Sequence, residues 1–182
     1  GRLVRYNTSN SGIPGNLIVC AFTDSKGRVW FGTYGSGLFY YEKGRFVRLK
    51  ANGQADDRHI RDVNTINEDA YGNIWIGTNV SGLFCYETDG SLSSYSSTNS
   101  EIYSNGITHL YCGRKRILYV ATASGLFAMD TYTRTLSDLT ISAMGFTEHF
   151  DAVLTCICKD SRGLLWCGGK NGLRVYNETN GQ

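Results

Sequence analysis

Residues 69–78 read Asp-Ala-Tyr-Gly-Asn-Ile-Trp-Ile-Gly-Thr, and this stretch decides the fold because its pattern returns along the chain. The tetrapeptide Gly-x-(Val/Ile/Leu)-Trp occurs three times and ends at Trp30, Trp75 and Trp166, while a degenerate copy, Arg-Ile-Leu-Tyr, ends at Tyr119. These aromatic residues are 45, 44 and 47 positions apart, and each is followed six or seven positions later by Gly-Leu. A period in the forties with a glycine and an aromatic residue at fixed positions indicates a stack of similar units.

The flanks of this stretch predict four short strands in each unit. In the second unit, strands are expected at 63–69, 73–76, 83–86 and 92–95, separated by turns that contain Asp, Asn and Gly. Short strands at regular spacing with such turns are typical of antiparallel β-structure, and four strands per unit are typical of a propeller blade. We therefore expect an all-β fold of four antiparallel four-stranded β-propeller repeats, as part of a larger propeller.

The repeat also sets the expected domain organisation, which is a single propeller segment over residues 1–182. The blade repeats cover approximately 16–50, 63–97, 107–140 and 153–182. The third repeat is the most divergent, with replacements at four repeat positions: Gly113, Arg116, Tyr119 and Ala121.

The two ends of the chain are informative together. The last repeat stops after its third strand, whereas residues 1–6 resemble the fourth strand of the first repeat, residues 44–49, and are expected to form an orphan fourth strand. In one arrangement, this strand completes the last blade and closes a four-bladed ring. In the other, which we favour, the chain is an excised piece of a larger ring, and its apolar end faces would allow self-association.

Each repeated residue has an expected structural role. Asp24, Asp69 and Asp160 open turns in which the carboxylate accepts a backbone N–H two residues further on. The glycines that end these turns provide positive φ, and the aromatic residue packs between neighbouring sheets. If a two-residue turn closes each hairpin, the aromatic residues lie opposite four apolar residues: Ala21, Ile66, Leu110 and Ile157.

The same two-residue turn would place Cys156 opposite Cys167, where a cross-strand disulfide forms only in an oxidising compartment and with demanding geometry. The alternative is that all six cysteines are free thiols that pack as small apolar residues, since none belongs to a Cys-x-x-Cys pair. No metal and no cofactor are expected, because each Asp turn offers one carboxylate where a calcium site needs several oxygens.

The composition excludes several classes of protein. Of 182 residues, 41% are hydrophobic and 19% are charged, as in a folded chain. The net charge of +2 is spread along the chain, and the Arg-Lys-Arg run at 114–116 is expected to be a solvated turn, so nucleic-acid binding is not expected. Because no stretch reaches the roughly 18 apolar residues of a membrane span, no direct membrane contact is expected in this segment.

The repeat resembles a known family. The pattern Asp-x-x-Gly-x-(Ile/Val/Leu)-Trp-(Ile/Phe/Cys)-Gly-Thr, followed by Gly-Leu-x-x-Tyr, is similar to the two-component regulator propeller repeat. Residues 69–86 match it almost throughout, and residues 24–41 match nearly as well. Residues 11–16, Ser-Gly-Ile-Pro-Gly-Asn, resemble the link between blades in that family. The third repeat and residues 167–169 match less closely.

The resemblance implies a function. Such repeats form the periplasmic sensor region of hybrid two-component regulators, which are inner-membrane proteins of polysaccharide-degrading gut bacteria with a histidine kinase elsewhere in the chain. The expectation is a non-enzymatic sensor segment that contributes to recognition of an oligosaccharide and to signalling to the kinase. The alternatives are a propeller lyase or hydrolase resembling streptogramin lyase, and a passive protein-interaction scaffold.

Residues for enzymatic chemistry are few. The three histidines, His59, His109 and His149, lie far apart in the sequence, and no zinc-protease, nucleophile-elbow or phosphate-loop motif occurs. His109 falls in a first strand, which lines the channel of a propeller, and a packed imidazole is expected there. A lyase would need a histidine and a glutamate that converge on the channel mouth, and His109 has no evident partner in the other first strands.

Propeller geometry indicates where a ligand would bind. The turns between second and third strands share one face with the links between blades. Sugars are held by aromatic stacking together with amide and charged hydrogen-bonding groups, and this face gathers residues of those types. The expected ligand-binding residues are Tyr34, Arg58, His59, Arg61, Asn79, Tyr103, Asn105, His149, Lys170 and Asn171.

Overall fold

The computed structural model describes residues 1, 3–49, 60–113, 116–140 and 153–177, and the regular structure of these residues is β-strand. The strands form antiparallel sheets in the order of the sequence, numbered here as blades 1 to 4. In the described part of the chain, no helix has the length and apolar character needed to cross a membrane. The predicted all-β fold of propeller blades is confirmed.

The blades have the strand order of a meander. Blade 1 consists of β1 (Ile18–Thr23), β2 (Val29–Thr33), β3 (Leu38–Glu42) and β4 (Arg45–Arg48). Blade 2 consists of β5 (Val63–Glu68), β6 (Ile74–Thr78), β7 (Leu83–Tyr86) and β8 (Leu92–Tyr95). Blade 3 consists of β9 (Ile107–Cys112), β10 (Ile117–Thr122), β11 (Gly125–Asp130) and β12 (Leu136–Asp138). Blade 4 consists of β13 (Leu154–Lys159), β14 (Leu164–Gly169) and β15 (Gly172–Asn177).

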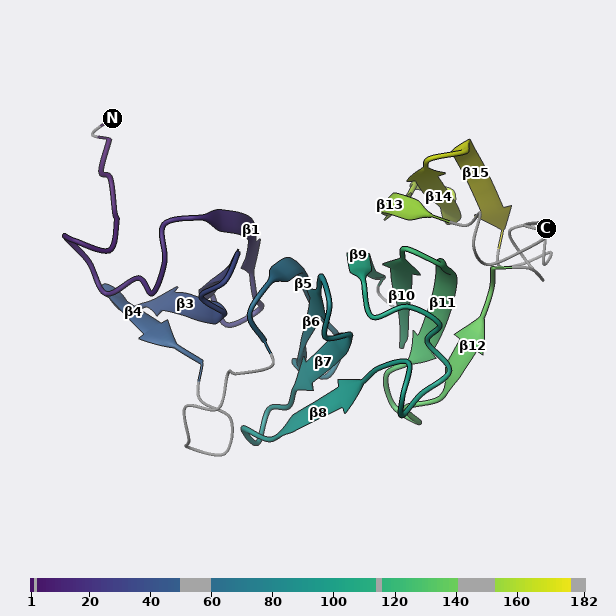
Figure 1. Ribbon diagram of the computed structural model, residues 1–182, viewed down its shortest axis with the longest axis horizontal. Helices are drawn as coiled ribbons and strands as arrows, with labels where there is room; N and C mark the ends of the chain where they lie inside the picture. Colours follow the sequence, from purple (N-terminus) through teal and green to yellow (C-terminus); the bar gives the residue numbers. More distant parts are fainter. Residues whose placement is uncertain (2, 50–59, 114–115, 141–152, 178–182) are drawn as a thin grey trace.

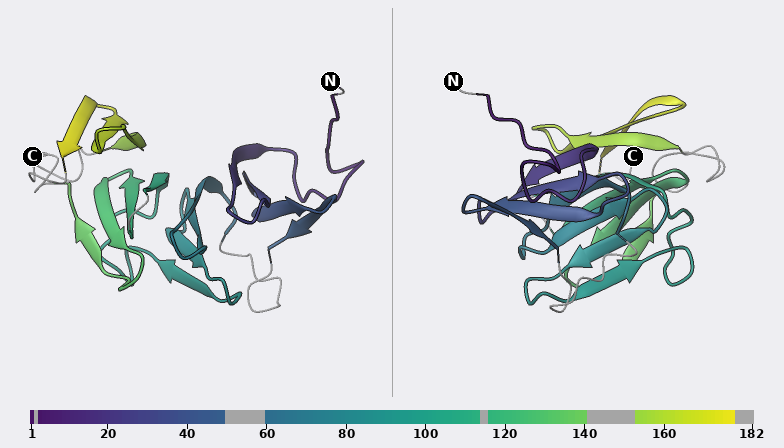
Figure 2. Two further views of the ribbon diagram at one scale, coloured as in Figure 1. Left: turned by 180° about the vertical axis from the view of Figure 1, so that it is seen from behind. Right: turned by 60° about the vertical axis from the view of Figure 1, so that its left-hand side comes forward.

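The blades stand side by side in an open arc (Figure 1). The first strands β1, β5, β9 and β13 lie on the concave side, and the fourth strands lie on the convex side (Figure 1). Blade 1 and blade 4 are at opposite ends of the arc (Figure 2). The arrangement in which the N-terminal strand closes a four-bladed ring is therefore not the one adopted.

The predicted orphan fourth strand at residues 1–6 has no sheet partner among the residues that the structure describes. Residues 3–6 have no strand structure and pair with no sheet, and Leu3 is 96% exposed. The ring of Tyr6 instead packs edge-on against Phe46 of blade 1, with 5.1 Å between the centroids. A strand depends on ladder hydrogen bonds to a neighbour, and no neighbour pairs with this segment here.

The hairpin turn between first and second strands is one residue longer than predicted. In blade 2, the Asp69 N–H donates to the Asn73 carbonyl at 3.0 Å, and the Gly72 N–H donates to the Asp69 carbonyl at 3.1 Å. Gly72 has a φ of 83°, which fits a three-residue hairpin loop with a left-handed glycine. The register therefore shifts by one residue, and the aromatic residues face other partners than predicted: Trp30 faces Phe22, Trp75 faces Asn67, Tyr119 faces Tyr111, and Trp166 faces Cys158.

The same shift overturns the predicted cysteine pair. Cys167 lies opposite Ile157, and Cys156 lies opposite Gly168. Because successive residues of a strand point to opposite faces, a one-residue slip puts the two thiols on different faces of the sheet. All six cysteines are free in the structure.

The repeated aromatic residues form the core between blades, as predicted. Trp30 and Trp75 are completely buried, and Tyr119 is 3% exposed. Trp75 packs with Leu118, Val120 and Phe127 of the next blade, so each aromatic residue fills the space between its own blade and the following one. Trp166 is only half-buried, because its side of blade 4 lies at the end of the arc.

Candidate functional site

The repeated aspartates are fully engaged in their own hairpins. In blade 2, Oδ1 of Asp69 accepts the N–H groups of Tyr71 at 2.9 Å and Asn73 at 3.0 Å. Its Oδ2 accepts the side-chain amide of Asn73 at 3.0 Å and the indole N–H of Trp75 at 2.9 Å. The predicted bond to the backbone two residues on is confirmed, and the bond to the tryptophan six residues on was not predicted.

The same carboxylate–indole bond recurs in blades 1 and 4. Oδ2 of Asp24 accepts the Trp30 indole N–H at 2.8 Å, and Oδ2 of Asp160 accepts the Trp166 indole N–H at 3.1 Å. A neighbouring arginine also donates to each carboxylate, from Arg28 in blade 1 and from Arg162 in blade 4. These carboxylates hold the hairpin to the core aromatic residue, and their oxygens are already occupied by donors.

The hydrogen bonds change the acidity of two of these carboxyl groups. Burial opposes ionisation of Asp24, but bonds from its tryptophan and arginine outweigh burial and lower the pKa of Asp24. Desolvation likewise opposes ionisation of Asp160, but bonds from Arg162, from a backbone N–H and from Trp166 lower the pKa of Asp160 to about 2.

Stability is therefore expected to fall as the pH decreases from about 4 to about 2. The unfolded carboxyl groups have pKa values near 4, so the unfolded chain binds more protons than the folded chain in this range. The stability from Asp24 and Asp160 is complete above the unfolded pKa and is lost as the pH falls through the folded pKa, which is about 2 for Asp160. Urea unfolding at several pH values between about 6 and 2 measures this loss, and Asp160→Asn should reduce its pH dependence. Equal stability at both ends of the range would contradict the assignment.

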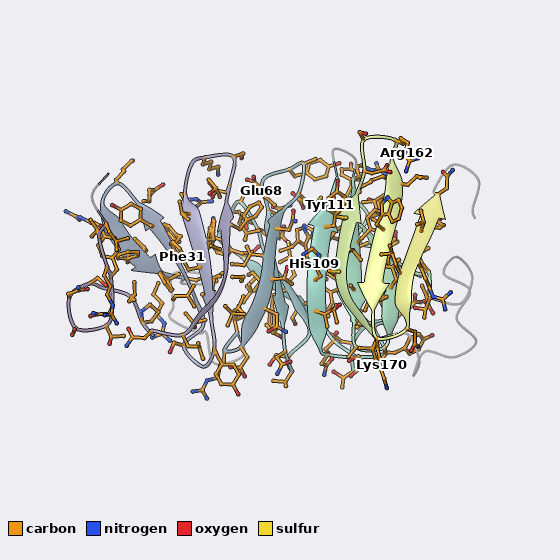
Figure 3. The ribbon with its side chains drawn as sticks, turned by 90° about the horizontal axis from the view of Figure 1, so that it is seen from above. Phe31, Glu68, His109, Tyr111, Arg162 and Lys170 are labelled. Carbon is orange, nitrogen blue, oxygen red and sulfur yellow. The ribbon has the colours of Figure 1, made fainter. Side chains whose placement is uncertain are left out.

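One edge of the arc carries the turns between second and third strands together with the links between blades. We call it the linker face: turn residues 34–37, 79–82, 123–124 and 170–171, with link residues 13–17, 60–62, 102–106 and 153. Figure 3 shows Lys170 on this edge and Arg162 on the opposite one.

A repeated backbone bond fixes the turns of the linker face. The residue after the second strand donates its N–H to the carbonyl of the residue that precedes the first strand of the same blade. The four pairs are Tyr34 to Leu17, Asn79 to Asp62, Ala123 to Gly106 and Lys170 to Val153, at 2.8–3.1 Å. The turn glycines Gly37 and Gly82 also donate to the next link, at Arg61 and Asn105. The side chains of this face are therefore presented from a fixed backbone.

The structure places the described ligand-binding candidates along this face and does not gather them at one point. Tyr34 and Tyr103 are 60% and 57% exposed. Asn105 is half-buried, and its side-chain oxygen already accepts the Ser97 N–H at 2.8 Å. The remaining described candidates are exposed: Arg61, Asn79, Lys170 and Asn171. Three candidates lie outside the described residues: Arg58, His59 and His149.

A hollow of about 420 Å³ opens beside the link between blades 2 and 3. Its volume lies within the usual range of small-molecule sites, about 300–1,000 Å³. Asn105 is the one predicted residue in its lining, and the hydroxyl and amide groups there belong to Ser81, Ser94, Ser96, Thr98, Asn99 and Asn105. None of these side chains is charged, and those of Ser96, Asn99 and Asn105 already make hydrogen bonds within the link. Sequence reasoning missed the serines because isolated serines in turns are common in any loop.

His109 connects two blades. Its Nδ1 accepts the backbone N–H of Ile157 at 3.3 Å, which joins the first strands of blades 3 and 4. Burial lowers the pKa of His109, which favours the neutral imidazole that this bond requires. Figure 3 shows His109 between the two edges of the arc. Among the described residues, no cluster of three or more His, Cys, Asp or Glu side chains suits a metal ion.

Comparison with known proteins relates the chain to one family and to several solved folds. The model of the two-component regulator propeller matches residues 12–35 and 60–80. The extracellular domain of a hybrid two-component system from B. thetaiotaomicron has a similar fold, with 23% identity and a TM-score of 0.77 over 97% of this chain and 24% of that chain. An extracellular domain of a one-component system from the same organism gives 20% identity and a TM-score of 0.74 over 93% of this chain and 24% of that chain. Streptogramin B lyase gives 15% identity and a TM-score of 0.67 over 92% of this chain and 53% of that chain.

The similarities cover only part of the related proteins and concern the fold. The chain spans about a quarter of the length of the two bacterial extracellular domains. At these identities, the likeness to solved structures establishes the fold alone. No match is found among curated protein sequences. Each segment matched by the family model contains a link and the hairpin that ends at Trp30 or Trp75. Two segments of the chain, residues 12–35 and 60–80, are therefore similar to the two-component regulator propeller repeat.

Proposed function

We propose that this chain is part of the extracytoplasmic, periplasmic sensor of a hybrid two-component regulator. In this proposal it is non-enzymatic, contributes to recognition of an oligosaccharide and transmits the signal toward a histidine kinase. The observation that carries the proposal is the match of two repeats to the two-component regulator propeller. The similar fold of extracellular domains from two-component and one-component systems agrees with it.

The linker face is the proposed recognition surface. Exposed tyrosines such as Tyr34 and Tyr103 offer flat apolar rings with a polar tip, which suits a sugar ring. Asn79 supplies an amide near them, and Arg61 and Lys170 supply cations on the same face. Because the candidates are spread along the arc, the surface fits an extended oligosaccharide better than a single sugar.

A non-enzymatic role is supported by the way in which the titratable groups are used. Each of the three repeated aspartates accepts hydrogen bonds from backbone N–H groups of its own turn and from the indole N–H of its tryptophan. His109 accepts a backbone N–H from the next blade. These four groups therefore maintain the blades in the described part of the chain.

Tyr34→Ala and Tyr103→Ala are each expected to weaken oligosaccharide binding by about fivefold to tenfold, through loss of about 1 kcal/mol of ring stacking. Calorimetry against a panel of plant, host and fungal oligosaccharides would first identify a ligand, and titration of the variants would then measure the change. Tyr132→Ala is the matched control, because Tyr132 is 67% exposed but lies in the turn after β11 on the opposite edge. Unchanged affinity in both linker-face variants, or turnover of a bound sugar, would contradict the proposal.

A further inference from the structure

The first strands of neighbouring blades meet at the edges of their sheets. Each first strand pairs with the second strand of its own blade, and the first strands contact one another on the concave side of the arc (Figure 1). An edge strand presents backbone N–H groups that its own sheet does not satisfy, and a buried N–H group needs a partner. The bonds between these edges therefore contribute directly to the contact between blades.

One position of the first strand lies opposite a small residue of the second strand in every blade. Each first strand has an irregular register near its start, as in a β-bulge, and the residue that follows the irregularity pairs with a glycine or an alanine. We call this place the latch position. The four pairs are Cys20 with Gly32, Thr65 with Gly77, His109 with Ala121, and Cys156 with Gly168.

The latch residues of blades 2 and 3 each accept a backbone N–H from the next first strand. The Leu110 N–H donates to Oγ1 of Thr65 at 3.2 Å, and the Ile157 N–H donates to Nδ1 of His109 at 3.3 Å. Leu110 and Ile157 each directly follow the latch position of their own blade. The same bond therefore joins blade 2 to blade 3 through a hydroxyl and blade 3 to blade 4 through an imidazole.

The residue before the latch position supports the first of these junctions more than the second. Asn64 donates its side-chain amide to the Ile107 carbonyl of the next blade at 3.0 Å. Its equivalent in blade 3 is Thr108, whose hydroxyl oxygen is buried and has no hydrogen-bond partner in the described part of the chain. The contact between blades 3 and 4 therefore depends more on the bond of His109.

The two latches differ in chemistry because an imidazole titrates and a hydroxyl does not. A neutral imidazole with its proton on Nε2 accepts at Nδ1, whereas an imidazolium has an N–H at both nitrogens and accepts at neither. A proton on Nδ1 would face the Ile157 N–H, so protonation breaks the bond. Burial lowers the pKa of His109, which keeps the imidazole neutral and the latch closed at neutral pH.

The strands around His109 offer no carboxylate that would stabilise its charged form. The titratable side chains of the strands packed against β9 are Glu68 of β5, Tyr119 of β10, and Cys156, Cys158 and Lys159 of β13, β9 itself adds Tyr111 and Cys112, and β6 has none. The oxygens of Glu68 accept the N–H and the hydroxyl of Ser25 at 2.7 and 2.8 Å. The ammonium of Lys159 lies 5.7 Å from the centroid of the Tyr119 ring. A positive charge on His109 therefore gains no acidic partner from these strands.

We propose that His109 is an acid-sensitive latch between blades 3 and 4. The neutral imidazole holds the Ile157 N–H, and uptake of one proton from solvent releases it and loosens the contact between β9 and β13. Thr65 keeps blades 2 and 3 joined at the same pH, so acid acts on one junction of the arc. The latch is independent of the proposed recognition function, since it needs no ligand.

Hydrogen exchange of two backbone amides tests the latch. After correction for the intrinsic rate at each pH, the protection of the Ile157 amide is expected to fall as the pH decreases from about 7 to about 5, because a histidine released from the contact has a pKa near 6.5. Linkage to one proton limits the fall to about tenfold for each pH unit, and the fall ends at the lower pKa of the closed state. The Leu110 amide in the same chain is the internal control, and its protection should not change.

His109→Thr gives blade 3 the latch residue of blade 2, without a titrating group. The protection of Ile157 in this variant should not depend on pH over the same range. His109→Gln also keeps an oxygen that can accept the N–H and serves the same purpose if circular dichroism shows that the threonine variant does not fold. Constant protection of Ile157 in the unmodified chain, a parallel fall for Ile157 and Leu110, or a pH dependence that persists in the variant would each overturn the proposal.

Discussion

Trp75→Ala is expected to lower the free energy of unfolding by about 3–5 kcal/mol, the usual effect of removing a buried tryptophan. The side chain is completely buried between blades 2 and 3. Its indole N–H donates to Asp69, and the guanidinium of Arg134 from blade 3 lies 4.8 Å from the ring centroid. Alanine leaves a cavity, removes one of the two donors to Oδ2 of Asp69, and leaves Arg134 without its aromatic contact.

Urea unfolding followed by intrinsic fluorescence and circular dichroism measures this loss. Trp75→Phe keeps an aromatic ring and removes the indole N–H, so its effect should lie between those of the unmodified chain and Trp75→Ala. Tyr132→Ala is the surface control, because Tyr132 is 67% exposed and such changes usually cost less than about 0.5 kcal/mol. An effect of Trp75→Ala as small as that of Tyr132→Ala would show that the tryptophan is not a core residue.

The strands and blades could be predicted from the sequence because each repeat contains the residues that form the turn and the core. Each unit places an aspartate, a left-handed glycine and an aromatic residue at fixed intervals, and all three act within one hairpin. The turn length could not be predicted, because Asp69 and Gly72 fit a two-residue loop and a three-residue loop equally well in sequence. The structure contains the longer loop, in which Oδ1 of Asp69 also bonds the N–H of Asn73. The additional loop residue shifts the register of the hairpin by one position. The same shift in blade 4 places Cys156 and Cys167 on different faces of the sheet.

The threonine of the repeated Gly-Thr has a structural role that the spacing of the repeat does not predict. The hydroxyl of Thr33 donates to the Gly37 carbonyl at 2.7 Å, and that of Thr78 donates to the Gly82 carbonyl at 2.8 Å. Both threonines are buried, so the bond closes the turn of the linker face from inside. Its signal was present in the sequence, since a threonine four residues before Gly-Leu recurs.

The candidate site is harder to predict than the fold because a polar residue in a link can either hydrogen-bond within the link or bind a ligand. The sequence predicts Asn105 as a ligand-binding residue, yet its side-chain oxygen accepts the Ser97 N–H and its backbone carbonyl accepts the Gly82 N–H. Asn16 makes the equivalent bond to Thr8 in the link before blade 1. A pattern of Asn and Ser therefore indicates a folded link first, and the proposed recognition surface rests on exposed side chains that do not recur, such as Tyr34 and Tyr103.

Asp69→Ala is expected to destabilise the chain by about 3–5 kcal/mol, the range for removal of one partner from a buried charged group. The carboxylate is 5% exposed and accepts four hydrogen bonds. Its loss leaves donors on Tyr71, Asn73 and Trp75 without an acceptor, and each buried unsatisfied group costs about 1–3 kcal/mol. The turn would also lose the bonds that hold its longer loop closed.

Comparison with Asp69→Asn and Asp89→Ala separates these contributions. Asparagine keeps one oxygen that can accept the N–H groups of the turn. On the indole side it places an NH₂ group, which cannot accept the Trp75 N–H. The loss of stability in Asp69→Asn is therefore expected to be smaller than that in Asp69→Ala. Asp89 is exposed, and in the described part of the chain its carboxylate accepts the N–H and the hydroxyl of Ser91, so Asp89→Ala should destabilise the chain much less than Asp69→Ala. Because the Asp69 carboxylate and the Trp75 indole share a bond, the double variant Asp69→Ala with Trp75→Phe should lose less than the sum of the single losses. Additive losses in urea unfolding would mean that the two residues stabilise the blade independently. The carboxylate–indole bond would then not hold the hairpin to the core.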